Sequence, residues 1–264
     1  MTERTIPMRP LSRLALRVPE ITAYFWIIKA LSTAMGESAS DYLVHAMNPV
    51  LAVGLGFVGF VVALVLQFSM RHYLAWTYWL AVAMVGVFGT MAADVLHVGF
   101  GVPYFASTVL YLVALAAVFI TWQTREGTLS IHSISTARRE ALYWAAVVAT
   151  FALGTAAGDL TAVTLHLGYL GSGVLFAAVI AVPVIGYRWF GWNPILAFWF
   201  AYVVTRPLGA SFADWFGKPA GVGGLGLGDG PVTLVLTIAI ACLVAYLAIT
   251  RKDVQRQETG HTAV

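Results

Sequence analysis

Charged side chains are scarce in this sequence, and their scarcity excludes an ordinary soluble domain. Only 10% of the 264 residues are Asp, Glu, Lys or Arg, whereas soluble domains contain about 25%. Hydrophobic residues make up 60% of the chain, which is more apolar surface than a globular core can hide. Lipid must therefore be the solvent for much of the chain, whose length suits about eight spans of roughly 20 residues each.

Cysteine and catalytic motifs are also nearly absent. Cys242 is the single cysteine, which excludes an internal disulfide and a cysteine metal cluster. The sequence has no HExxH motif and no Ser/His/Asp or Cys/His arrangement. The glycine-rich stretch at residues 221–230 follows no strand, so we expect a surface or re-entrant loop there and no phosphate site. We therefore expect a protein that is not an enzyme.

What the chain does contain is a series of long apolar segments joined by short connections. They cover residues 21–46, 49–70, 74–98, 103–123, 141–166, 169–190, 194–216 and 230–250. Helices are expected, because every backbone polar group must be satisfied internally in lipid. The predicted fold class is an all-α membrane protein with about eight transmembrane helices.

Basic residues lie almost entirely on one side of these spans. Twelve of the 15 Lys and Arg residues are in the two tails or in the connection after each second span. They are Arg4, Arg9, Arg13, Arg17, Arg71, Arg125, Arg138, Arg139, Arg188, Arg251, Lys252 and Arg256. The positive-inside rule then predicts that both termini face the cytoplasm.

Four segments share one pattern without a gap: an aromatic residue, Trp, nine residues, Gly, four residues and Asp. The positions are Trp26, Trp79, Trp144 and Trp199; Gly36, Gly89, Gly154 and Gly209; and Asp41, Asp94, Asp159 and Asp214. Because the Trp-to-Trp steps are 53, 65 and 55 residues, each repeat holds two spans. All four repeats then enter the membrane from the same side, related by an axis along the membrane normal in a ring-like or two-plus-two arrangement.

The repeats divide the chain into seven parts. Residues 1–20 and 251–264 are the cytoplasmic tails, and residues 124–140 form a cytoplasmic connection. The four repeats cover residues 21–70, 74–123, 141–190 and 194–250.

Each position in the pattern has a physical interpretation. The Trp lies near the cytoplasmic end of its span, where an amphipathic ring suits the lipid–water interface. The Gly lies about 15 Å deeper, where a small residue allows close helix packing or local unwinding. The Asp lies about 22 Å from the Trp, which is in the outer third of the membrane or at its outer edge.

The four aspartates are the candidate functional residues. An intramembrane carboxylate costs about 2.5–3.5 kcal/mol on insertion scales, so four at equivalent positions indicate a shared purpose. We expect Asp41, Asp94, Asp159 and Asp214 to line a transport or cation-binding site where the odd-numbered spans meet, with Glu37 beside them. Their oxygens suit a divalent metal. The structural alternatives are caps of the following helices and a salt-bridge network.

The repeats also differ in ways that predict an asymmetric site. Lys29 occurs only in the first repeat and Arg206 only in the fourth, and we expect both cations to tune the charge of the acids. Thr90 and Thr155 stand where the first repeat has Glu37, so their hydroxyls are expected to add oxygen ligands.

The stretches GESASDY, FGTMAADVLH, LGTAAGDL and RPLGASFADW carry the Gly and Asp of the pattern. With the repeated Trp, this pattern resembles a family of bacterial membrane proteins of unknown function. Each member has four tandem repeats of two transmembrane segments with a characteristic tryptophan. The resemblance covers nearly the whole chain outside the tails, and it implies a multi-pass protein of the bacterial inner membrane. It implies no activity.

We therefore expect a small-solute transporter, for a divalent metal or in a proton-coupled mode, that uses the aspartates. The alternatives are a non-transporting module, such as a sensor, scaffold or assembly partner, and an intramembrane enzyme acting on a lipid or quinone. A bound divalent cation is the only cofactor expected. The expected partners are the lipid bilayer and a small ion or solute, with homo-oligomers left open and nucleic acid excluded.

Overall fold

Side-chain caps and prolines set where several helices begin. The computed structural model describes residues 16–254. Asn48 and Asn193 each accept hydrogen bonds from the two backbone N–H groups at the start of the following helix, and each precedes a proline. Such a residue satisfies donors that have no partner inside the helix, and proline at the first position loses no hydrogen bond. Thr22 and Thr136 cap two further helices.

Eight α-helices follow one another through residues 16–254, without a strand among them. They are α1 (Ala23–Ala46), α2 (Pro49–Ser69), α3 (Ala75–Asp94), α4 (Tyr104–Glu126), α5 (Ala137–Asp159), α6 (Gly168–Trp189), α7 (Pro194–Gly217) and α8 (Asp229–Thr250). All of these except α1 are long and apolar enough to cross a membrane. α1 has 24 residues, but it carries the three charged side chains of Lys29, Glu37 and Asp41. The prediction of an all-α, membrane-spanning fold is confirmed.

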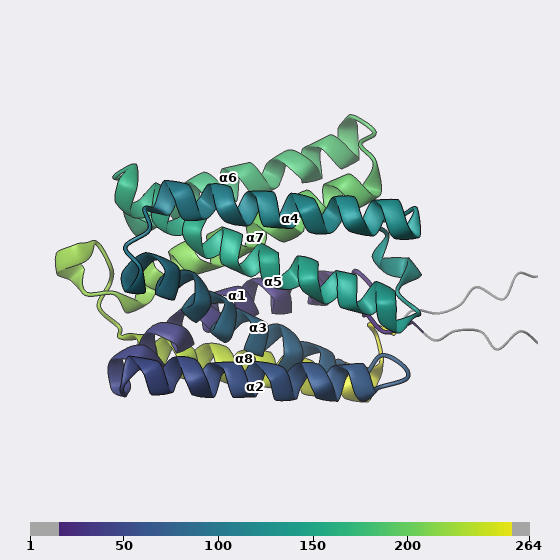
Figure 1. Cartoon of the computed structure of the whole chain (residues 1–264), viewed down its shortest axis with the longest axis horizontal. Helices are drawn as coiled ribbons and strands as arrows, with labels where there is room; N and C mark the ends of the chain where they lie inside the picture. Colours follow the sequence, from purple (N-terminus) through teal and green to yellow (C-terminus); the bar gives the residue numbers. More distant parts are fainter. Residues whose placement is uncertain (1–15, 255–264) are drawn as a thin grey trace, which may run out of the picture.

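The four odd-numbered helices form an inner ring. α1 packs against α3, α3 against α5, α5 against α7, and α7 against α1 (Figure 1). In the most apolar windows of α3, α5 and α7, 56–67% of the residues are buried, against 17–22% in the even-numbered helices. The inner ring can therefore hold polar side chains, because the outer helices shield it from lipid.

Each outer helix covers the inner helix of the next repeat. α2 packs on α3, α4 on α5, α6 on α7, and α8 returns to α1 (Figure 1). This cyclic exchange links each repeat to its neighbour and closes the circle between the last and the first. Of the two arrangements that the sequence left open, the ring is the one found.

The glycine of each repeat lies where its inner helix meets the next one. A Cβ atom on Gly36 would lie 2.7 Å from the carbonyl carbon of Gly86 in α3, which is too close for any side chain. The other three glycines also lie against the next inner helix. A Cβ atom would meet Phe151 of α5 at Gly89, Arg206 of α7 at Gly154, and Thr33 of α1 at Gly209. The helices are continuous through all four glycines, so these residues serve close packing and not unwinding.

The tryptophans do not lie where the sequence placed them. Trp79, Trp144 and Trp199 are only 2–4% exposed, so the expected position at the lipid interface is wrong for these three. Their rings pack at a tilt against aromatic residues of the neighbouring inner helices, as Trp144 does against Tyr78. Because the inner ring is closed, an aromatic side chain at this end of an inner helix packs against the neighbouring helix and not against lipid.

The end of the bundle with these aromatic residues also holds both described chain ends (Figure 1). The backbone N–H of Arg17 donates to Ile134, and that of Glu20 donates to Asp253. Apart from Lys218, the described basic residues of the tails and connections lie at this end, from Arg17 to Lys252, and the four aspartates lie at the other. Arg4, Arg9, Arg13 and Arg256 lie outside the described residues.

Candidate functional site

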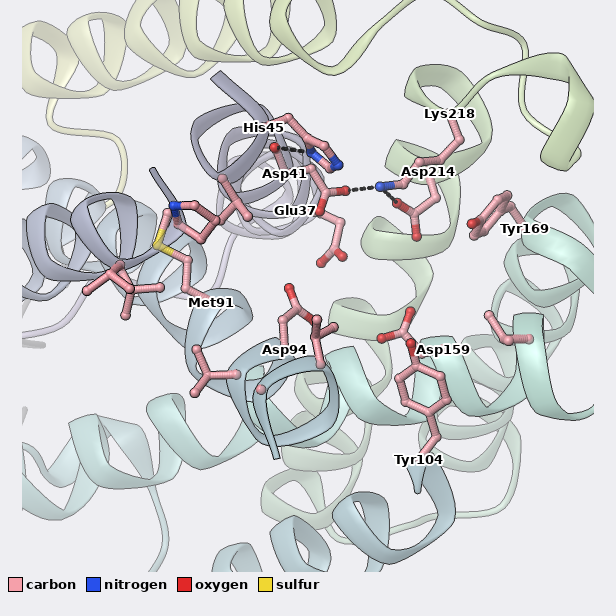
Figure 2. A pocket seen from close by; sticks show the side chains of 18 residues that line it. Glu37, Asp41, His45, Met91, Asp94, Tyr104, Asp159, Tyr169, Asp214 and Lys218 are labelled. Atoms are coloured by element: carbon pink, nitrogen blue, oxygen red, sulfur yellow. Dashed lines mark hydrogen bonds and ion pairs between the residues drawn. The ribbon is translucent and has the colours of Figure 1, made fainter. Parts of the chain in front are cut away.

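A cavity of about 660 Å³ opens at the aspartate end of the bundle. Its lining includes Glu37 and all four repeat aspartates, Asp41, Asp94, Asp159 and Asp214 (Figure 2). The structure therefore brings together the five acids that the sequence singled out. At the mouth, Val50 and Val98 are each 80% exposed, so the cavity is open at this end.

The helix geometry around Asp94 and Asp159 is unusual. Each of these residues is the last of its α-helix and is followed by a five-residue π-helical segment, Val95–Gly99 or Leu160–Thr164. In the first and fourth repeats, Asp41 and Asp214 lie within regular helix. π-helical turns are rare and occur often at functional sites. The second and third repeats therefore share a local geometry that the other two lack.

The floor of the cavity is an ion pair at the centre of the ring. Arg206 is fully buried, and its Nη2 donates to Glu37 Oε2 at 2.5 Å. The same nitrogen donates to Thr90 Oγ1 at 2.5 Å and to Thr155 Oγ1 at 2.7 Å. The positions equivalent to Glu37 in the second and third repeats thus meet on one guanidinium. Their hydroxyls accept hydrogen bonds from this arginine, whereas the sequence analysis expected them to be ligands of a bound cation.

Lys29 does not approach the acids. Its Nζ lies 4.1 Å from the ring centre of Phe151 and 4.2 Å from that of Tyr202, and no described hydrogen-bond partner is within reach. The expectation that Lys29 tunes the acids directly is therefore wrong. Glu37 is eight residues further along α1, about 12 Å at the rise of an α-helix, and the long side chain of Arg206 occupies the space between the two.

Lys218 lies on the rim of the cavity, directly after α7. Its Nζ is 2.5 Å from Asp41 Oδ2 and 3.9 Å from Asp214 Oδ1. Burial by itself lowers the pKa of Lys218, but the two carboxylates outweigh burial and the net pKa is raised. The glycine-rich loop positions this lysine, because the N–H groups of Leu225 and Leu227 donate to the last carbonyls of α7. The predicted surface loop thus caps the end of α7, where Lys218 lies.

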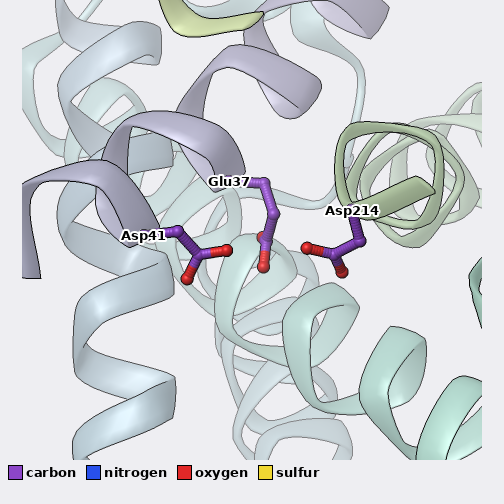
Figure 3. A group of neighbouring side chains, drawn as sticks. All are labelled: Glu37, Asp41 and Asp214. Carbon is purple, nitrogen blue, oxygen red and sulfur yellow. The ribbon is translucent and has the colours of Figure 1, made fainter. Parts of the chain in front are cut away.

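The acids fall into two groups. Ligand atoms of Glu37, Asp41 and Asp214 lie within 4.8 Å of one another, a spacing that can hold a metal ion (Figure 3). Asp94 and Asp159 are outside that group, so the described residues do not form the four-aspartate metal site expected from the sequence. No ion pair or hydrogen bond to either side chain occurs in the described part of the chain.

Two tyrosines that line the cavity were not predicted from the sequence. Tyr104 and Tyr169 lie in the first turn of the second helices of repeats 2 and 3, and both line the cavity (Figure 2). Each follows the aspartate of its own repeat by ten residues. Extending the repeat alignment past the aspartate would have revealed this shared spacing, whereas the first and fourth repeats have Leu51 and Gly224 there.

Fold and site together define a helical membrane protein built from four tandem two-helix repeats around an acidic cavity. Its sequence matches the family described as Repeat of Unknown Function (DUF347) at residues 24–73, 77–128, 142–191 and 197–253. These segments cover most of the chain, which belongs to this family. No curated protein and no solved structure matches it.

Proposed function

We propose that this protein is a membrane transporter for a small cation, which binds in the acidic cavity. The observation that carries the proposal is the convergence of five intramembrane acids, one or two from each repeat, on a single cavity. Carboxylates in membrane segments are costly and commonly mark ion or proton pathways.

The charge balance of the cavity favours a cation. Arg206 and Lys218 are the basic residues in contact with its acids. When all five acids are ionised, these two cations leave a net charge of about −3 in a site with low-dielectric walls. Such a field attracts cations and repels anions, and protons can also occupy the aspartates during a transport cycle.

Side chains fill the axis of the bundle on the side of Arg206 away from the cavity, which favours a carrier over an open pore. Below Arg206 the axis is filled by Lys29 between Phe151 and Tyr202. Further along, the hydroxyls of Tyr78 and Tyr143 are hydrogen-bonded to each other. A solute in the cavity could cross the protein only after these layers rearranged, as in alternating access. The positive-inside rule places the closed, basic end in the cytoplasm, in line with a bacterial inner-membrane protein.

The test is cation flux into proteoliposomes that contain the purified protein. Replacing Asp94 and Asp159 together by Asn should abolish flux, because it removes the two unpaired carboxylates with little change in volume. Glu20→Gln is the matched control, since Glu20 is exposed at the opposite end of the bundle, and it should leave flux unchanged. Wild-type flux in the double variant, with normal elution in size-exclusion chromatography, would refute the proposal. Absence of flux in the wild type would favour a non-transporting module.

A further inference from the structure

The two sides of the cavity are neutralised to different degrees. On one side, Arg206 holds Glu37 and Lys218 holds Asp41, each at 2.5 Å. On the other side, Asp94 and Asp159 have no basic partner in the described part of the chain. A cationic ligand therefore meets its strongest unbalanced charge on the side formed by repeats 2 and 3.

Asp214 lies with Glu37 and Asp41 in the other group of acids, but it too has no cation at hydrogen-bonding distance in the described part of the chain. It is only 6% exposed, it faces the cavity, and its closest cation is Lys218 Nζ at 3.9 Å, beyond hydrogen-bonding distance (Figure 2). Its side chain accepts no hydrogen bond from any residue between 16 and 254. A buried carboxylate without a donor is costly, and a ligand that supplies positive charge would remove that cost.

Aromatic rings stand beside these carboxylates. In Figure 2, Tyr104 lies next to Asp159 and the hydroxyl of Tyr169 points toward Asp214. Each tyrosine thus pairs with the aspartate of the next repeat, because each outer helix packs on the next inner helix. Carboxylates and tyrosine rings together are the groups that bind organic ammonium ions in proteins.

Apart from His45, the rest of the wall is apolar. Valines supply most of it, with Met91; they are Val44, Val50, Val53, Val95, Val98 and Val163. A volume of about 660 Å³ is in the range of sites for organic ligands, 300–1,000 Å³, and far exceeds what one metal ion fills. An apolar wall contributes nothing to a hydrated metal ion, but it stabilises hydrocarbon attached to a charged nitrogen.

We propose that the cargo is an organic ammonium ion with an apolar substituent, held by Asp94, Asp159 and Asp214 and by the rings of Tyr104 and Tyr169. This inference rests on the proposed transport function and names its substrate class. Of the trio that can ligate a metal, Asp41 binds the Lys218 ammonium and Asp214 lies 3.9 Å from it, while Glu37 is bound by Arg206. Lys218 therefore occupies part of the space that a metal ion would need there.

The experiment measures binding of benzyltrimethylammonium to the purified full chain in detergent, by calorimetry, with Mn²⁺ as the competing probe. We expect saturable binding of benzyltrimethylammonium. Tyr104→Leu and Tyr169→Leu should each weaken it about tenfold, or about 1.4 kcal/mol, which lies between an exposed and a fully desolvated cation–π contact. Tyr104→Phe and Tyr169→Phe keep the ring and should bind nearly as the wild type does. Tyr187→Leu is the matched control, because Tyr187 is 57% exposed at the opposite end of α6.

The outcomes separate this inference from the proposed function. Ring-dependent binding of benzyltrimethylammonium supports both. Binding of Mn²⁺ that Asp214→Asn abolishes, without binding of benzyltrimethylammonium, overturns the substrate class and leaves a cation transporter. Benzyltrimethylammonium binding that the Leu variants leave unchanged overturns the assigned site. Absence of binding by both probes, with no flux in proteoliposomes, overturns both proposals.

Discussion

Replacing Arg206 by Met tests whether the floor of the cavity holds the inner ring together. Arg206 is fully buried, and the carboxylate it binds belongs to Glu37, which is 4% exposed. Removal of one partner from a buried ion pair costs about 3–5 kcal/mol, because the other charge is left without compensation. Methionine keeps an unbranched stem where Arg206 packs against Gly154, so the packing changes little while the charge is lost.

The assay is thermal unfolding of the purified protein in detergent. For a chain of this length 1 kcal/mol shifts Tm by about 2–4 °C, so we expect Arg206→Met to lower Tm by about 10 °C. Arg138→Met is the matched control. Arg138 also binds a carboxylate, that of Glu126, but its side chain is 63% exposed, and an exposed ion pair contributes at most about 1 kcal/mol.

A double variant makes this prediction sharper. Glu37→Gln combined with Arg206→Met removes both charges, so most of the lost stability should return. Equal Tm shifts for Arg206→Met and Arg138→Met would refute the reasoning. A double variant that is no more stable than Arg206→Met would refute it as well, because the cost would then lie in packing and not in the unpaired carboxylate.

Two further predictions concern a glycine and the rim lysine. Gly36→Ala should destabilise the protein by about 1–3 kcal/mol through overpacking, because its Cβ meets the backbone of Gly86. Gly54→Ala, with open space around its Cβ, should be neutral or stabilising in the same thermal assay. Since the pKa of Lys218 is raised by Asp41 and Asp214 despite burial, its stabilising effect should be complete below the ordinary pKa of 10.5 and decline above it. Above neutral pH the difference in Tm between wild type and Lys218→Met should follow that course, and a decline already complete below pH 10.5 would contradict it.

The repeat allowed the convergence of the aspartates to be predicted, because the spacing of its residues fixes their depth along each helix. Equal spacing from Trp to Asp, together with two spans per repeat, brings all four aspartates to one end of parallel helices. The order of the ring was not predictable in the same way. It depends on which outer helix packs on which inner helix, and every outer helix is apolar enough to pack on any neighbour.

The different roles of Lys29 and Arg206 could have been inferred from their spacing relative to the aspartate of their own repeat. Arg206 precedes its repeat aspartate by eight residues and Lys29 by twelve. One helical turn separates Arg206 from the level of Glu37, and its side chain spans that turn. Two turns separate Lys29 from Glu37, so its ammonium meets Phe151 and Tyr202 instead. Counting back from the aspartate would have assigned only one of the two cations to the acids.

The divergence of the repeats shows how a symmetric scaffold can carry an asymmetric site. Repeats 2 and 3 keep the aspartate, the π-helical segment and the tyrosine ten residues later, while repeats 1 and 4 supply the charged residues Glu37, Arg206 and Lys218. A four-fold ring of unpaired carboxylates would repel itself inside a low-dielectric bundle. Neutralising one half of the ring from within the chain lowers that repulsion, and it leaves the other half free to bind a cation that must also be released.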